Sequence, residues 1–358
     1  MILDRRTMIG GALTAAATSV GTPMRVLAAA PPPAPPAPAV PPELLHPEYR
    51  AFAGPLAQFS SAGPPMTRDG LEQMRNAPNP FPDKLRNDIP HERRVIRAKD
   101  GHDLAIYVVN ARPGTARPAI LHIHGGGFVA GKAADAVAAL QDLCATLDCV
   151  AVSVDYRLAP ETRWKGSLED NYDGLSWLFD HAAELGADRR RIAVMGESAG
   201  GGHAALLAIA ARDRGKVPLC FQCLVYPMLD DRTGTTVKPP PHVGTLLWTA
   251  GRNHFGWESL LGVPPGSRQV PIAAVPARIS DLTGLPPAFI GVGTLDLFCL
   301  EDVEYAQRLL KNGVQTELLV VPGVFHGFDN RMFPTKLREW FTNTKINALR
   351  RGFGIMPT

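Results

Sequence analysis

A short glycine-rich segment, Gly196-Glu197-Ser198-Ala199-Gly200-Gly201, most constrains what this chain can fold into. It follows the apolar run 191–195 and precedes a stretch of small residues, 203–211, that suits a helix. A serine flanked by glycines between a strand and a helix is typical of a sharp turn that exposes the hydroxyl. Amides at the start of the helix then point toward that hydroxyl and stabilise negative charge. By itself this pattern fits a nucleophilic serine and a purely structural turn equally well.

The size and charge of the chain limit the class of protein. Its 358 residues, 45% of them hydrophobic, suffice for one large α/β domain or for two smaller ones. The formal net charge is +3, and outside residues 1–29 the chain holds 34 basic and 33 acidic residues. So balanced a charge argues against nucleic acid as the main partner.

The first 29 residues have the pattern of an export signal. Arg5 and Arg6 precede a mildly apolar run to about residue 20, and small residues follow at Ala28 and Ala29. This pattern predicts a twin-arginine-type signal peptide, cleaved after one of these alanines, and a periplasmic or secreted protein. The apolar run is too short to span a bilayer, so we expect no membrane anchor. The alternative is an uncleaved leader on a cytoplasmic protein.

A proline-rich linker is predicted to follow at 30–42, because eight of the twelve residues from Pro31 to Pro42 are proline. Such a segment favours a stiff polyproline II spacer over a folded element. The folded domain is therefore expected at 43–358.

Five cysteines are too few, and odd in number, for a disulfide framework. Cys220 and Cys223 have C-x-x-C spacing but lie inside an apolar, strand-like run, 218–226. Positions three apart on a strand point to opposite faces, so the pair is predicted to be core thiols and not a metal site.

From about residue 93 extended and helical patterns alternate, and the middle strands are apolar on both faces, as in a buried parallel sheet. The alternation predicts a doubly wound α/β sheet. The expected strands are 93–98, 104–110, 119–124, 150–156, 191–195, 219–226, 288–294 and 315–321, and the expected helices are 134–147, 167–185, 199–214, 299–312 and 334–349.

Two segments, about 43–90 and 230–285, do not follow this alternation. Long segments of this kind between regular elements are usually functional. We expect the two to form a helical cap over the carboxyl edge of the sheet. Trp248, Phe255 and Trp257 in the second segment either line a substrate pocket or pack within the cap.

A second glycine-rich loop, His124-Gly125-Gly126-Gly127-Phe128, directly follows the predicted strand 119–124. Three glycines let backbone amides turn into a cavity, where they would share the charge of an oxyanion with the amide of Ala199. A loop of this type is known in lipases and esterases.

A serine nucleophile also needs a base and an orienting acid. His326 follows the predicted strand 315–321, and Asp296 follows 288–294, so both lie at the carboxyl ends of strands, where sites in open α/β sheets form. Glu301 and Asp302 are rivals for the acid, but they fall on the next predicted helix. The order Ser198, Asp296, His326 is that of the α/β-hydrolases.

Together these motifs resemble the hormone-sensitive-lipase-like family of α/β-hydrolases. The segments 155–161 (Asp-Tyr-Arg-Leu-Ala-Pro-Glu) and 281–287 (Asp-Leu-Thr-Gly-Leu-Pro-Pro) match that family too. The resemblance covers roughly 90–350 and implies an α/β-hydrolase fold with an eight-stranded, mostly parallel sheet.

The resemblance also implies residue roles in the oxyanion hole. Gly126, Gly127 and Ala199 would donate to the oxyanion, Gly125 would shape the loop, and His124 would support it. No metal or organic cofactor is implied.

The implied activity is that of a serine carboxylesterase, which hydrolyses a small-molecule ester of short or medium acyl chain through an acyl-enzyme. Two departures from the family are Glu197, where many members carry Asp or Thr, and Leu297, where many carry proline. The alternatives are an amide or lactone hydrolase with the same triad, and a non-catalytic ligand-binding member of the fold. A homodimer is left open.

Overall fold

An eight-stranded sheet forms the centre of this computed structural model, which describes residues 40–62, 66–77 and 84–355. The strand order is β1-β2-β4-β3-β5-β6-β7-β8, with β1 and β2 antiparallel to their neighbours and the remaining pairs parallel. The predicted leader 1–29 and most of the linker 30–42 lie outside the described residues. The strands are β1 His91–Arg97, β2 Asp103–Val109, β3 Arg117–Ile123, β4 Val150–Val154, β5 Ala187–Glu197, β6 Phe221–Val225, β7 Ala288–Gly293 and β8 Thr316–Val321.

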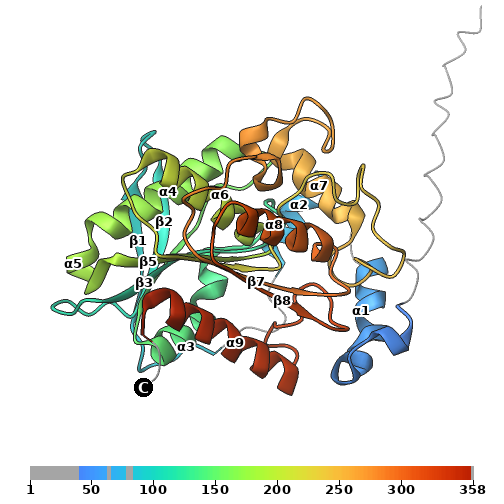
Figure 1. Ribbon diagram of the computed structural model, residues 1–358, viewed down its shortest axis with the longest axis horizontal. Helices are drawn as coiled ribbons and strands as arrows, with labels where there is room; N and C mark the ends of the chain where they lie inside the picture. Colours follow the sequence, from blue (N-terminus) through green and yellow to red (C-terminus); the bar gives the residue numbers. More distant parts are fainter. Residues whose placement is uncertain (1–39, 63–65, 78–83, 356–358) are drawn as a thin grey trace, which may run out of the picture. The chain divides into compact units, whose positions relative to one another are not determined.

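Helices cover both faces of the sheet, as Figure 1 shows. One face packs against α3 (Val137–Leu147) and α9 (Lys336–Phe353). The opposite face packs against α4 (Trp164–Asp180), α6 (Ala199–Arg214) and α8 (Cys299–Lys311), with the short α5 (Ala182–Leu185) beside β5.

The buried strands divide their side chains between two cores. In β3, Leu121 packs into the core under α4 and α6, and its neighbour Ile120 packs into the core under α3 and α9. This alternation is the period of two that any strand imposes, and it explains why residues 118–121 of β3 are all apolar. The two cores lie on the two faces of the sheet and hold the strands whose carboxyl ends carry the predicted site residues.

The predicted strands and helices are confirmed, although the bounds of most of them differ by one to four residues. Two of the differences have a clear physical reason. β5 begins at Ala187, earlier than expected, because Ala187 pairs with Arg117 through the backbone although charged residues follow it. The helix expected at 167–185 is two helices, α4 and α5, and Gly186 ends the second with a φ of 71°. A Cβ on Gly186 would lie 1.9 Å from the carbonyl oxygen of Arg112, so the turn requires glycine.

The two segments outside the alternation are only partly helical. The first contains α1 (Arg50–Ala62) and α2 (Leu71–Asn76), with 3₁₀ turns at Pro42–Leu44 and Pro47–Tyr49. The second contains α7 (Ala250–Leu261) and 3₁₀ turns at Ile272–Ala274 and Pro276–Arg278. The segments touch where the amide of Leu247 donates to Ser60 Oγ at 2.9 Å. In the described part of the chain, none of the helices combines the length and apolarity that a membrane span needs.

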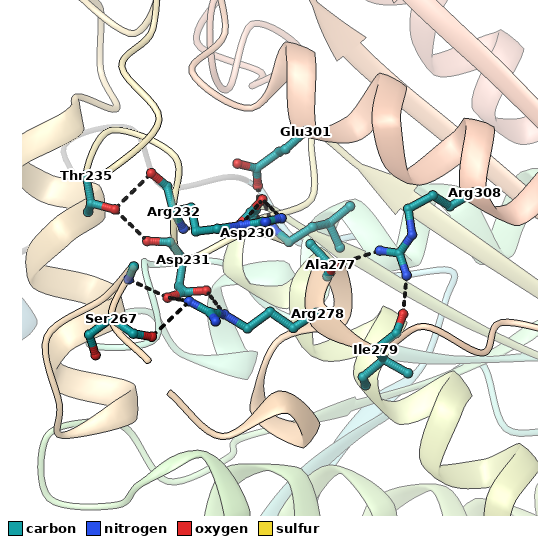
Figure 2. A network of polar contacts seen from close by, with 12 residues as sticks. Asp230, Asp231, Arg232, Thr235, Ser267, Ala277, Arg278, Ile279, Glu301 and Arg308 are labelled. Carbon is teal, nitrogen blue, oxygen red and sulfur yellow. Dashed lines mark hydrogen bonds and ion pairs between the residues drawn. The ribbon is translucent and has the colours of Figure 1, made fainter. Parts of the chain in front are cut away.

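A buried polar network ties the segment 230–285 to the sheet domain (Figure 2). The fully buried Asp231 carboxylate accepts from Arg278 Nε at 2.6 Å, from Arg278 Nη2 at 2.9 Å and from the amide of Gly266 at 2.6 Å. From α8, Glu301 accepts the amide of Leu229 at 2.7 Å, and Arg308 donates to the carbonyl of Ala277 at 2.7 Å. The irregular segment is therefore held by charge-assisted hydrogen bonds where regular structure is missing.

Candidate active site

Ser198 lies on a strained turn between β5 and α6. Its φ of 57° and ψ of −124° are unusual for a residue with a side chain and cost of the order of 1–3 kcal/mol. The turn is held because the amide of Ser198 donates to Val225 O at 2.9 Å, and Ser198 O accepts from the amide of Met228 at 2.9 Å. A Cβ on Gly200 would lie 2.0 Å from Ile123 O. The flanking glycine is thus required by the close approach of β3 to the helix.

The structure brings Ser198, His326 and Asp296 together in one chain of hydrogen bonds. His326 Nε2 lies 2.9 Å from Ser198 Oγ, and His326 Nδ1 lies 2.8 Å from Asp296 Oδ2. Asp296 is fully buried, and its other oxygen accepts the amide of Phe298 at 3.0 Å. This geometry leaves Nε2 free to accept the serine proton when Nδ1 carries its own proton toward the carboxylate.

Glu301 and Asp302, the rivals for the acid, lie elsewhere. Both are buried on α8, where Glu301 accepts hydrogen bonds from the backbone amides of Leu229 and Asp230. Among the described residues neither oxygen of Asp302 has a hydrogen-bond partner, and burial raises its pKa well above the ordinary value. Neither side chain bonds to His326, so Asp296 alone takes that position among the three.

Aromatic rings fix the plane of the His326 imidazole. The ring of Tyr226 packs edge-on at 4.7 Å, and that of Phe298 packs edge-on at 5.2 Å, both between centroids. The Tyr226 hydroxyl donates to Asp329 Oδ1 at 2.6 Å, and Lys345 Nζ of α9 lies 3.4 Å from Asp329 Oδ2. The loop that carries the histidine is therefore tied to both β6 and α9.

The loop after β3 places two backbone amides, those of Gly126 and Gly127, beside the cavity that contains Ser198. Gly126 and Gly127 have φ values of 117° and 61°, which favour glycine. Within the described residues, neither amide donates to a protein acceptor. A Cβ on Gly127 would lie 2.2 Å from the ring of Trp248, so glycine here also makes room for the aromatic side chain. Ala199, the third predicted donor, is the first residue of α6.

His124 and Gly125, the first residues of this loop, hold its conformation through hydrogen bonds and close packing. His124 Nδ1 lies 2.8 Å from Gly125 O, and its ring stacks on that of Tyr156 at 4.4 Å between centroids. The Tyr156 hydroxyl donates to His124 O at 3.0 Å. Burial lowers the pKa of His124 to about 4, so its imidazole is neutral and its Nδ1–H is the donor to Gly125. A Cβ on Gly125 would lie 2.9 Å from Glu197 O.

A cavity of about 330 Å³ opens over these groups. Trp248 lines this cavity, which is the first of the two alternatives that the sequence left open for the aromatic residues of the segment 230–285. Phe255 and Trp257 do not; Trp257 is buried against Phe128, with 5.0 Å between ring centroids. The lining residues are Gly125, Gly126, Gly127, Glu197, Ser198, Tyr226, Leu247, Trp248, Arg252, His326 and Gly327.

Glu197, the residue before the serine, turns toward the α3 and α9 face. Its Oε2 lies 2.9 Å from His122 Nε2, and His122 Nδ1 lies 2.9 Å from Ser153 Oγ. Burial opposes ionisation of Glu197, but the neighbouring His122 and Lys345 together hold its pKa below the ordinary value. This carboxylate therefore anchors the base of the serine turn as an ionised group.

Sequence reasoning missed Tyr226, Leu247 and Arg252 as cavity residues. Tyr226 directly follows β6, so its place at the end of a central strand was a usable signal. Leu247 and Arg252 belong to an irregular segment, and nothing in their local pattern indicates where they lie.

The cysteines lie apart from these groups. Cys223 is buried in β6, Cys220 precedes that strand and is partly buried, and burial raises the pKa of both thiols to about 12. Across the ranges that the structure describes, no group of three or more His, Cys, Asp or Glu side chains is arranged to hold a metal ion.

Known proteins share this arrangement of elements. A family model described as the alpha/beta hydrolase fold matches residues 120–330. Esterase LipI of Mycobacterium tuberculosis is 34% identical over 292 residues, which cover 79% of this chain and 88% of LipI. Carboxylesterase NlhH of the same species is 32% identical over 308 residues, covering 83% and 92%.

A solved structure agrees with these relatives. The chain resembles a bacterial heroin esterase with a TM-score of 0.77 and 35% identity, over 87% of this chain and 98% of that one. The family match covers more than half of the chain and includes both glycine-rich loops, Asp296 and His326. The chain therefore belongs to the α/β-hydrolase family, in the hormone-sensitive-lipase-like group that its motifs indicate.

Proposed function

We propose that the protein is a carboxylic ester hydrolase that uses Ser198, His326 and Asp296 as its catalytic triad. The observation that carries the proposal is the hydrogen-bonded chain from Asp296 to Ser198, which ends in a cavity beside the amides of Gly126 and Gly127, neither of which donates to another described residue. Relatives named esterase and carboxylesterase support the same activity.

The geometry supports a two-step acyl transfer. Ser198 Oγ attacks the ester carbonyl carbon while His326 Nε2 takes the hydroxyl proton, and the amides of Gly126, Gly127 and Ala199 stabilise the oxyanion. The C–O bond to the alcohol breaks as His326 returns the proton to the leaving oxygen. Water then attacks the acyl-enzyme by the same route, which releases the carboxylic acid and restores Ser198.

Replacement of the nucleophile tests this assignment. Ser198→Ala should leave the fold intact and lower kcat for p-nitrophenyl butyrate by on the order of 10³-fold or more, because only the oxyanion donors and binding then remain. A fluorophosphonate probe should label the wild type and not the variant. Ser280→Ala, at an exposed loop serine, is the matched control. Near-normal turnover by Ser198→Ala would contradict the triad.

Short to medium acyl chains are the proposed substrates. Trp248 lies against Gly127 and limits a cavity of about 330 Å³, which suits a small acyl group better than a long one. A series of p-nitrophenyl esters should show its highest kcat/KM at eight carbons or fewer. A maximum at sixteen carbons would overturn the preference, and faster cleavage of matched anilides than of esters would favour an amidase.

Two further proposals do not depend on the active site. Export to the periplasm or the medium is the first. The twin-arginine pattern at Arg5 and Arg6 supports a periplasmic or secreted protein with a cleaved leader. Self-association as a homodimer is the second, and light scattering on the mature protein would decide it.

A further inference from the structure

The His326 imidazole has to keep one orientation while its bond to Ser198 changes. Asp296 holds Nδ1 at 2.8 Å throughout, but Nε2 bonds to Ser198 Oγ only until that oxygen is bonded to the acyl carbon. The Nε2–H group must then point at the leaving oxygen in order to protonate it. One hydrogen bond at Nδ1 does not fix the tilt of the ring, so groups other than Ser198 have to hold it during the reaction.

Tyr226 packs against this imidazole and is itself anchored at two points. Its ring lies edge-on to that of His326, with 4.7 Å between centroids. Its amide donates to Gly291 O at 2.7 Å, and its hydroxyl donates to Asp329 Oδ1 at 2.6 Å. Its φ of 34° is unusual for a residue with a side chain. Because strained backbone of this kind persists only where neighbours hold it, and is common at functional sites, the strain points to a role for this ring.

The acceptor of the Tyr226 hydroxyl belongs to the loop that carries the histidine. Asp329 is the third residue after His326, and its side chain is only 8% exposed. Its second carboxylate oxygen lies 3.4 Å from Lys345 Nζ of α9. Burial opposes the charge on Lys345, but the Asp329 and Glu197 carboxylates outweigh this effect and hold its pKa above the ordinary value. The hydroxyl is therefore held by a carboxylate that a charged lysine in turn holds in place.

Given the ester hydrolase activity proposed above, on which this inference rests, we infer that Tyr226 is a positioning residue for the histidine. Its hydroxyl bond to Asp329 fixes the phenol ring, and the ring fixes the tilt of the His326 imidazole. Nε2 thereby stays directed first at Ser198 Oγ and then at the leaving oxygen. Displacement of a reacting group by about 1 Å costs on the order of 100-fold in rate, so even a small change in this tilt is measurable.

Removal of the hydroxyl tests this inference with the full enzyme. Tyr226→Phe keeps the ring and leaves Asp329 paired with Lys345. Two esters of one acid are compared: ethyl butyrate, whose alkoxide needs a proton from His326 to leave, and p-nitrophenyl butyrate, whose phenolate leaves without one. The kcat/KM, which reports the steps up to release of the alcohol, should fall about tenfold for the ethyl ester and about threefold or less for the nitrophenyl ester. A smaller folded fraction would instead lower both by the same factor.

Matched variants assign the effect to the bond between Tyr226 and Asp329. Tyr49→Phe removes another hydroxyl bond to the same loop, at 2.9 Å from Phe328 O, but from a ring that packs on Phe325 and Phe328 and not on the imidazole. This control should keep the wild-type ratio of the two esters. Asp329→Asn, which keeps an acceptor and loses the charge, should change the ratio in the same direction by less. Combined with Tyr226→Phe, it should change the ratio no further, because both substitutions act on one bond.

The outcomes separate this inference from the activity itself. If Tyr226→Phe keeps the wild-type rates or loses the same factor on both esters, the inference is wrong and the esterase proposal stands. The same holds if Tyr49→Phe shows the selective loss, because the stability of the loop and not the Tyr226 ring would then position the histidine. If the wild type hydrolyses neither ester, the esterase proposal fails and this inference falls with it. Fluorophosphonate titration of Ser198 gives the concentration of active enzyme in each variant, so an unfolded fraction is not counted as a slower rate.

Discussion

At the scale of single residues, the buried His203 makes the free energy of unfolding depend on pH. His203 of α6 is packed between the rings of Phe128 and Tyr156, with 4.8 Å between centroids in both cases, and its Nε2 has no hydrogen-bond partner in the part of the chain that the structure describes. Burial lowers its pKa to about 3. Between pH 6.5 and about 3, the unfolded chain therefore binds a proton at His203 that the folded chain does not.

The sign of the effect follows from this difference in bound protons. Stability falls as the pH drops below 6.5, by roughly 2 kcal/mol from this group between pH 7 and pH 5. In His203→Phe this contribution is absent, so its free energy of unfolding should fall between pH 7 and pH 5 by roughly 2 kcal/mol less than that of the wild type. Urea unfolding at both pH values measures the difference. A variant with the wild-type difference between pH 7 and pH 5 would show that His203 is protonated in the folded protein.

Trp248 is a residue whose size should decide the acyl preference. Its ring lies over Gly127, and its Nε1 donates to Asn253 Oδ1 at 3.2 Å. Trp248→Ala should enlarge the cavity and move the best p-nitrophenyl ester to a longer chain, at a cost in stability of about 3–5 kcal/mol. Trp340→Ala, at an exposed tryptophan of α9, should leave the profile unchanged. An unchanged profile in Trp248→Ala would mean that other residues limit the chain length.

At the scale of elements, the segment 230–285 depends on buried ion pairs. Asp231 is fully buried and accepts hydrogen bonds from Arg278 Nε and Nη2, so removal of the cation leaves a buried, uncompensated carboxylate. Arg278→Leu should lower the free energy of unfolding by about 3–5 kcal/mol and reduce activity, because this segment carries Trp248 and Arg252.

An exposed pair provides the control for that prediction. Arg97 and Asp103 form an ion pair with side chains that are 71% and 69% exposed. Arg97→Leu should change the free energy of unfolding by less than about 1 kcal/mol. Denaturant unfolding of both variants makes the comparison, and equal losses would show that the buried network in Figure 2 is not what holds the segment.

At the scale of the whole molecule, the leader should act as an address and not as an anchor. Twin-arginine signals are read by a receptor, so conservative replacement of both arginines should block export although the charge is kept. Arg5→Lys with Arg6→Lys should leave the esterase activity in the cytoplasmic fraction, while Arg25→Lys should be exported as the wild type is. Activity of the double variant in the periplasmic fraction would contradict the proposed signal.

The sheet and the positions of the three site residues could be predicted because they depend on local pattern and on topology. Parallel strands place their carboxyl ends at one edge, so Ser198, Asp296 and His326 were expected near one another once the strands were recognised. The start of β5 could not be predicted, because charged residues after Ala187 pair only through the backbone. The division of the helix 167–185 likewise depends on a glycine turn against Arg112.

The sequence by itself determined the alternation of strands and helices, which follows from periods of two and 3.6 residues, and the glycine loops, which need conformations that other residues rarely adopt. The order of the triad is recognised by its resemblance to the α/β-hydrolases. Only the tertiary structure decided which side chains of the irregular segments enter the cavity. Trp248 and Arg252 reach it and Trp257 does not, because contacts between residues distant in the chain place the segment 230–285 over Ser198. Such contacts have no local pattern, so the chemistry of the serine could be predicted from sequence and the shape and charge of its pocket could not.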